Sequence, residues 1–304
     1  ETVNKEKGII AQEIQMYEDE PDWRLFFGVL ENMYPEHPLH IDIAGTVDSI
    51  MDITPELLYE NHATFYHPSN MNLFVVGKLD PEEMMKLIRE NKAQKEYAPA
   101  EAIKRIIPEE TVKDIKPYNF IHMTVNRPES IVGVKGIREI PSGIEALKYK
   151  TTMDLLLTLL FGPTSANYLK LYDKGIIDDS FSFEFNLDRT FHFIDVSGDT
   201  KDSAVFSAEI KKLLLEAKIS SELTDENLAK VKKRTIGQEL QALNSLEYIA
   251  NQYSQPMYGE ATLFDVVPII ESVTLDEIKK AAEEFMIEDH MTTFHILPKG
   301  DKDA

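Results

Sequence analysis

Two stretches of this chain recur far downstream in the same order, which constrains the fold more than any other feature. Residues 10–15 reappear at 236–241 with four identities in six positions, so that Glu13 is matched by Glu239. A second echo preserves four residue types without a gap: Thr54, Phe65, Met71 and Phe74 match Thr274, Phe285, Met291 and Phe294. Recurrence in the same order is typical of a duplicated structural unit. We therefore expect two homologous halves.

The two copies differ in how much chain precedes them. Roughly 120 residues separate the region near Pro117 from Glu239, whereas twelve residues precede Glu13. We expect the first half to be truncated at its N-terminus, so that any site needing residues from that absent part is incomplete. A sheet that lacks some of its strands exposes strand edges and apolar surface. We therefore expect this half to pair with an identical chain or a paralogue, or to retain the lost segment.

Composition narrows the class of protein. A length of 304 residues with 43% hydrophobic and 9% aromatic residues predicts about two globular domains. There is no apolar run near the ~20 residues of a membrane span, and the charged N-terminus lacks a signal-peptide pattern, so we expect a soluble, cytoplasmic protein without a membrane partner. The formal charge of −21 argues against nucleic-acid binding. The absence of cysteine excludes disulfides and thiolate ligands.

The order of expected elements indicates an α+β fold built from two α/β-layered halves, each with a sheet packed against helices. Residues 71–77 are a run typical of a buried strand, between helices expected at 54–66 and 80–91. We assign residues 1–95 to the first domain, 96–117 to an extended linker and 118–304 to the second domain. The second domain should contain a helix over 144–160, a hairpin over 181–197 and long helices at 204–217 and 225–253.

Two carboxylates in the expected first helix are candidates for chemistry. Glu6 and Glu13 are seven residues apart, which places them about 20° apart around a helix. Hard oxygen ligands on one face suit a divalent metal. They are also compatible with ordinary surface charges, since Lys5 and Lys7 flank Glu6. Spacing alone leaves both interpretations open.

The common catalytic and nucleotide-binding motifs are absent from the sequence. Neither H-x-x-E-H nor H-E-x-x-H occurs, and the sequence lacks a G-x-S-x-G elbow, a phosphate-binding P-loop and a G-x-G-x-x-G turn. His37 and His40 have Pro38 between them, so we expect them in a loop and not as a helical ligand pair.

Three motifs together resemble one known family. They are the E-x(6)-E pattern from Glu6 to Glu13, the run 65–71 and the strand-turn 75–83. The chain resembles, over essentially its whole length, the pitrilysin, insulysin and mitochondrial-processing-peptidase group of zinc metallopeptidases, called inverzincins. Within that group it is most similar to the processing-protease-like proteins of Gram-positive bacteria.

The resemblance implies a set of roles. Glu13 would be the third protein ligand of a catalytic zinc, and Glu6 would support the site without binding the metal. The two histidine ligands and the general-base glutamate belong to an H-x-x-E-H motif that this chain lacks, so the chain holds no catalytic residue of its own and is predicted to be inactive alone. The intact protein would cleave unfolded peptides or small proteins by attack of zinc-bound water on a peptide carbonyl.

One departure from the family pattern opens an alternative. Relatives place an arginine and a tyrosine in the second half to hold the substrate backbone, and the matching region 167–179 has Tyr172 where arginine is usual. Tyr172 is therefore the candidate substrate-binding residue. The altered position favours a non-catalytic homologue that acts as a structural or substrate-presenting subunit, whereas retention of both Glu6 and Glu13 favours the peptidase. Glu239 is not expected to bind metal, because no histidine motif accompanies it.

Overall fold

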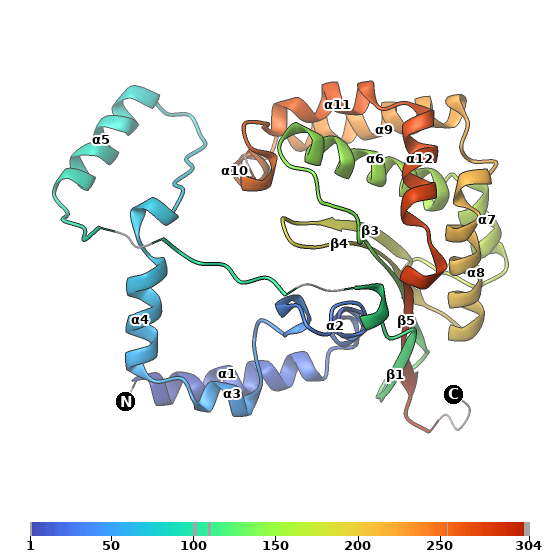
Figure 1. The fold of residues 1–304 in the computed structure, drawn as a ribbon, viewed down its shortest axis with the longest axis horizontal. Helices are drawn as coiled ribbons and strands as arrows, with labels where there is room; N and C mark the ends of the chain where they lie inside the picture. Colours follow the sequence, from blue (N-terminus) through green and yellow to red (C-terminus); the bar gives the residue numbers. More distant parts are fainter. Residues whose placement is uncertain (1, 100–101, 109–110, 254, 301–304) are drawn as a thin grey trace.

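The fold centres on one mixed five-stranded sheet. A computed structural model describes residues 2–99, 102–108, 111–253 and 255–300 (Figure 1). The strand order is β1-β5-β2-β4-β3, with β1 parallel to β5 and the other neighbours antiparallel. The strands are β1 Tyr118–Met123, β2 Glu129–Lys135, β3 Ser182–Leu187, β4 His192–Asp199 and β5 Met291–Pro298. A mixed sheet packed with helices confirms the α+β class.

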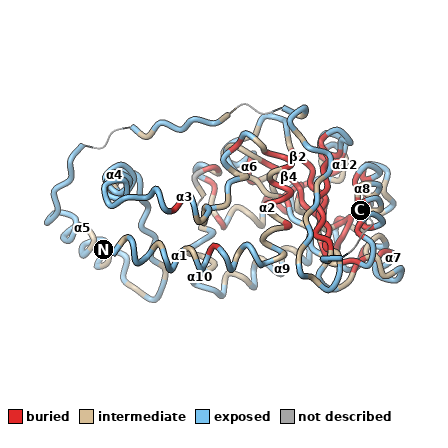
Figure 2. The backbone as a smooth tube through the Cα atoms, turned by 90° about the horizontal axis from the view of Figure 1, so that it is seen from below, coloured by how far each residue is buried: buried red, intermediate tan, exposed pale blue. Residues whose placement is uncertain are grey.

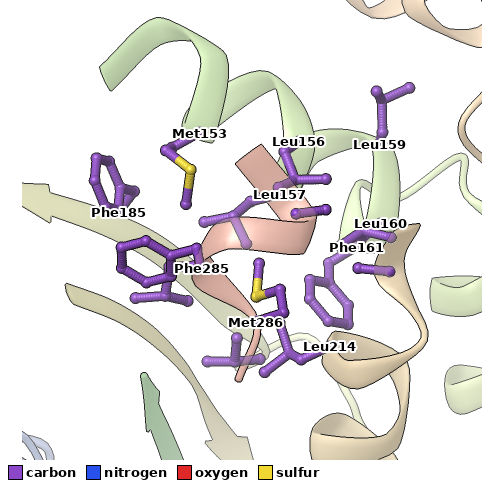
Figure 3. Packing of buried hydrophobic residues seen from close by; sticks show 14 of the residues in the cluster. Met153, Leu156, Leu157, Leu159, Leu160, Phe161, Phe185, Leu214, Phe285 and Met286 are labelled. Atoms are coloured by element: carbon purple, nitrogen blue, oxygen red, sulfur yellow. The ribbon is translucent and has the colours of Figure 1, made fainter. Parts of the chain in front are cut away.

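Three helices cover one face of this sheet: α6 (Ile144–Phe161), α8 (Ser203–Leu215) and α12 (Leu275–Phe285). α6 is mostly apolar and is buried along most of its length, although a few charged residues lie in its first three turns. Figure 3 shows Met153 and Leu157 of α6 packed toward Phe285 of α12. Outside α6 lie α9 (Asp225–Ala242) and α11 (Val266–Ser272), and α7 (Ala166–Asp173) comes after it in the chain.

The opposite face is covered by α2 (Pro21–Met33), which comes from far earlier in the chain. A second apolar cluster forms here, in which Leu30 and Met33 of α2 pack on Ile131, Phe193 and Phe294 of the strands. Because side chains alternate across a strand, these residues face α2 while their neighbours in sequence face α6 and α8. The strongly apolar segment after Pro21 thus forms a buried helix.

Close backbone contact fixes α2 on the sheet. Gly28 lies under the ring of Phe294, and a Cβ at this position would be only 2.4 Å from the ring. Asn32, fully buried, donates its side-chain amide to Thr292 Oγ1 (3.1 Å) and to the Thr293 carbonyl (3.2 Å). Burying an amide requires such partners, so this contact defines where α2 sits along β5.

The other elements before residue 118 are much more exposed. They are α1 (Thr2–Glu18), α3 (Val47–Met51), α4 (Pro55–Phe65) and α5 (Pro81–Ala93), and the buried residues among them are Ile14 and Ile50. Figure 2 shows this part as mainly pale blue, while the buried residues gather around the sheet. Within the described ranges, no helix is long and apolar enough to cross a membrane.

The duplication is visible in the local structure. α4 and α12 begin and end 220 residues apart, and the side chains of Thr54 and Thr274 cap them in the same way. A short 3-10 turn comes after each of them, at 68–70 and 288–290. α1 packs against α3 as α9 packs against α11. The echoes therefore correspond to equivalent elements.

The two copies diverge after this 3-10 turn. β5 is a central strand, whereas residues 71–76 have no regular structure and are largely exposed, so the predicted buried strand at 71–77 is wrong. A strand needs a hydrogen-bonded neighbour, and none of the described strands lies beside this segment. Its Phe74 instead contacts Tyr253, with ring centroids 4.5 Å apart.

The expected long helix at 225–253 is also divided. α9 ends at Ala242, and Ser245 caps a separate helix, α10 (Leu246–Gln252), by accepting a hydrogen bond from the Tyr248 amide. A serine that bonds backbone amides favours a helix start over a helix interior. The hairpin of β3 and β4 and the helix at 144–161 confirm the sequence-based predictions.

Candidate functional site

Helix α1 presents Glu6 and Glu13 to solvent. The hydroxyl of Tyr17, one turn after Glu13, donates to Glu13 Oε1 (3.3 Å), and the Glu13 charge raises the pKa of Tyr17. The Tyr17 ring stacks on Trp23 of α2 at 4.8 Å. Glu13 is thus connected through Tyr17 to the helix that packs on the sheet.

A second contact holds α1 against α3. Lys7 donates to the Met51 carbonyl (2.7 Å) across the end of α3. The lysine beside Glu6 therefore binds backbone, and no ion pair joins it to Glu6 among the described residues. Glu6 and Glu13 remain accessible on one helix.

The carboxylates of α1 could supply part of a metal site, but not all of its ligands. An accessible carboxylate is a normal zinc ligand, but a catalytic zinc takes three protein ligands. No group of three or more His, Asp or Glu within the described ranges is arranged to hold a metal ion. Glu13 could supply one ligand, and the others would have to come from another segment or chain. The roles of Glu13 and Glu6 stay predictions.

His37 and His40 are not placed to supply those ligands, because both belong to a loop turn. His37 Nδ1 accepts a hydrogen bond from the Leu39 amide (3.0 Å), and His40 Nδ1 lies 2.7 Å from the His37 carbonyl. Both side chains therefore stabilise the turn at Pro38–His40, in agreement with their expected loop position.

The repeat counterpart of Glu13 lies in a cavity of the second half. Glu239 on α9 accepts a hydrogen bond from the Tyr248 hydroxyl (2.7 Å). Burial, reinforced by this contact with Glu239, raises the pKa of Tyr248 to about 12. The cavity, about 310 Å³ in volume, lies between α6, α9, α10 and the edge strand β3, and Lys150 and Asp154 of α6 also line it.

Lys150 places a fixed positive charge in this cavity. Its ammonium group donates to both carboxylate oxygens of Asp154 and to the Phe185 carbonyl, each at 3.0 Å. An ammonium group has three donors, and all three are used here. Glu239, the repeat counterpart of Glu13, thus lines a cavity in which the Lys150 ammonium group supplies the positive charge.

Sequence reasoning missed Lys150, Asp154 and Tyr248. A Lys-x-x-x-Asp pair inside an otherwise apolar helix was the available signal, since charged residues on a buried helix need partners. Tyr248 lies after an unexpected helix break, so its approach to Glu239 had no sequence signal.

The structure does not bring Tyr172 to Glu13. Tyr172 lies on α7, about half exposed, and stacks on Tyr168 with ring centroids 5.9 Å apart. The nearby Asp179 carboxylate raises the pKa of Tyr172. Both overall views place α7 at the opposite end of the molecule from α1 (Figures 1 and 2). A substrate contact by Tyr172 remains a prediction.

Comparison with known proteins decides the family. Residues 52–235 match the family described as "Peptidase M16 inactive domain". The chain belongs to the M16 peptidase family. It is 46% identical over 299 residues to the uncharacterized zinc protease YmfH of Bacillus subtilis, an alignment that covers 98% of this chain and 69% of YmfH.

Solved structures agree with this membership. An M16-like peptidase from Alicyclobacillus acidocaldarius is 34% identical and superposes with a TM-score of 0.90 over 98% of this chain and 71% of that one. A protease from Helicobacter pylori, at 20% identity, has a TM-score of 0.83 with coverage of 98% and 72%, which shows the shared fold. The resemblance to the zinc metallopeptidase group is thereby confirmed for this M16 chain.

Proposed function

We propose that this M16 chain is the C-terminal portion of a zinc-dependent endopeptidase that cleaves unfolded peptides, and that Glu13 is its zinc ligand. The observation that carries the proposal is the difference in surroundings between Glu13 and Glu239, which occupy equivalent positions in the repeat. The first copy is an exposed carboxylate with no cation of its own among the described residues, while the second faces the Lys150 ammonium across a cavity. The name of the Bacillus relative, a zinc protease, supports the same function.

Bound zinc would polarise the peptide carbonyl and acidify a water molecule. The residues of this chain would then hold and orient one ligand. Glu13 would bind through the oxygen that Tyr17 leaves free, and the Tyr17–Trp23 stack would keep the carboxylate at a constant angle to α2. Glu6, two turns earlier on the same face, would orient the site without binding the metal.

The test needs the intact protein, because the chain spans about two thirds of its Bacillus relative. We expect stoichiometric zinc and cleavage of a quenched, unstructured peptide, both lost in Glu13→Gln. Glu18→Gln, which removes an exposed charge from the same helix, should retain both. Zinc content that is unchanged in Glu13→Gln would contradict the ligand role.

A non-catalytic subunit is the second candidate. It is favoured by the match to an inactive domain and by Tyr172 at the position where relatives have arginine. In that case the intact protein would bind no zinc and cleave nothing, yet would raise the activity of a paralogous peptidase mixed with it. Cleavage by the intact protein alone would exclude this role.

A homodimer or a heterodimer with a paralogue would suit the exposed apolar residues of the first half. Leu58, Leu73 and Val75 are 49%, 71% and 44% exposed, whereas the equivalent residues Ile278, Thr293 and His295 are buried. Unpartnered apolar surface of this kind favours association. The cytoplasmic location stays a prediction.

A further inference from the structure

Strand β1 lies at the edge of the sheet opposite to β3 (Figure 1). Among the described strands it pairs with β5 alone, in an unbroken register from residue 118 to residue 123. Sheet edges that stay free are usually protected by charged residues, proline or a bulge, which keep other strands away. β3 has Glu184 in its middle, whereas β1 contains no Asp, Glu, Lys, Arg or Pro. In a chain with a formal charge of −21, another strand can therefore approach β1 without meeting a carboxylate on it.

The backbone of β1 directs hydrogen-bonding groups outward at alternate residues. The carbonyls of Pro117 and Met123 accept hydrogen bonds from amides of β5 and of the residue after it, at 3.1 and 3.0 Å. Because these groups alternate along a strand, the odd-numbered residues face β5, and residues 118, 120 and 122 direct their amides and carbonyls away from it. One of these amides, that of Phe120, donates to the Asn119 side chain (2.9 Å). The outer edge of β1 therefore has the hydrogen-bonding groups that a further strand requires.

The side chains of the same residues form an exposed aromatic row. Tyr118 and Phe120 are 45% and 36% exposed, and their ring centroids are 5.9 Å apart. Phe120 meets the His122 ring edge-on at 5.6 Å. On this face α8 packs on β2 and β5 and leaves the row exposed. On the other face Ile121 and Met123 pack against the apolar cluster under α2. Both faces of the sheet are thus apolar up to this edge.

A second copy of β1 would match the edge. Antiparallel pairing about a two-fold axis at Ile121 would place Phe120 opposite His122 of the partner subunit. Both residues direct their backbone groups outward, so they would exchange hydrogen bonds, and Ile121 would occupy the non-hydrogen-bonded position on the axis. The phenyl and imidazole rings would meet on one face, and Ile121 would meet the partner's Ile121 on the other, without like charges in opposition. A two-fold contact requires such a self-complementary surface.

We propose that two copies of this chain associate through antiparallel pairing of their β1 strands, which would join two five-stranded sheets into one. This surface is separate from the exposed apolar residues of the first half, and its pairing does not depend on peptidase activity. One short strand pair is smaller than a standard protein interface, so the dissociation constant should be about 1–50 µM.

Disulfide formation tests the register directly, because the chain contains no cysteine. Ile121→Cys would place two thiols on the axis, where Cα atoms of a non-hydrogen-bonded pair are about 4.5 Å apart and a disulfide can form. We expect mild oxidation to convert most of the 304-residue chain into a covalent dimer. Leu240→Cys, at a 54% exposed position on α9, is the control for random collision and should yield at least about tenfold less dimer. Equal yields from the two variants would overturn the proposal.

Sedimentation equilibrium separates this edge from other surfaces. Phe120→Lys adds an ammonium group beside the axis in both copies and should weaken association at least about tenfold, with little change in the thermal midpoint because the position is exposed. Leu73→Lys adds the same charge to the exposed apolar residues of the first half and should leave association unchanged.

Two results would contradict β1 pairing. Dissociation in Leu73→Lys but not in Phe120→Lys would assign the contact to the first half. A chain that stays monomeric at about 200 µM would show that the edge does not pair with a second copy. Neither result bears on the peptidase proposal, and an intact protein without peptidase activity would leave a β1 dimer standing.

Discussion

The Lys150 ammonium lies 3.0 Å from both carboxylate oxygens of Asp154, within a cavity that also contains Glu239. The pair is partly buried and shares its lysine with the Phe185 carbonyl of the edge strand. It therefore joins α6 to β3, in addition to balancing charge in the cavity.

Replacing Lys150 by methionine should destabilise the chain by about 1–2 kcal/mol, because a part-buried carboxylate and a carbonyl would lose charge-assisted hydrogen bonds. Lys230→Met is the matched control, since Lys230 pairs with Glu226 at the same helical spacing on an exposed surface. That loss should be about 0–0.5 kcal/mol. Urea unfolding of both variants measures the difference, and equal losses would show that the cavity pair has no special role.

Gly28→Ala should lower the free energy of unfolding by about 1–3 kcal/mol, because the new Cβ would collide with the Phe294 ring and push α2 off the sheet. The control is Gly8→Ala on α1, where nothing lies within 4 Å of the added atom. That change should stabilise by about 0.5–1 kcal/mol through helix propensity. Thermal unfolding compares them, and a stabilising Gly28→Ala would refute the close packing described for α2.

The pH dependence of stability should change in Glu129→Gln. The folded-state pKa of Glu129 is about 7, above its usual value of 4.5, so between these pH values the folded chain holds a proton that the unfolded chain releases. Stability from this group therefore falls as pH rises through that window and is level above it. Glu129→Gln should be more stable than the wild-type chain by about 1–2 kcal/mol at pH 8 and similar to it near pH 4.5. Urea titrations at the two pH values test this, and parallel profiles would contradict the raised pKa.

Hydrogen exchange should separate the two copies of the repeat. Amides of α12 and β5 lie in the buried sheet layer, whereas those of α4 and residues 71–76 belong to an exposed segment. We expect the first copy to exchange faster by at least about tenfold, because local opening there exposes little apolar surface. Mass spectrometry of matched peptides gives the comparison. Equal protection would mean that the first copy is covered in solution.

Local sequence signals predicted the repeated helices well. The N-capping threonine and the apolar spacing of residues 275–285 specify α12, and the same signals specify α4. The turn after Leu187 and the apolar alternation around it specify the hairpin. These features depend on residues near one another in the chain, which is why they could be inferred without a structure.

Features that depend on distant partners could not be predicted in the same way. The apolar spacing of α2 indicates that a face is buried but not that β2 and β5 bury it. The run 71–77 has strand-forming residues, yet a strand requires a neighbour that local sequence does not specify. Glu129 is an ordinary acid in sequence and becomes unusual only because α2 closes over it. The metal role of Glu13 came from family resemblance and awaits its test.

The position of α2 has a consequence for cutting the chain. Cleavage anywhere between residues 96 and 117 would leave two fragments that share one apolar interior, because Leu30 and Met33 are on one fragment and Phe294 is on the other. The fragments should remain associated after such a nick. A polypeptide beginning at residue 118 would instead expose the apolar face of the sheet that α2 covers. It should aggregate, or bind another apolar helix on that face.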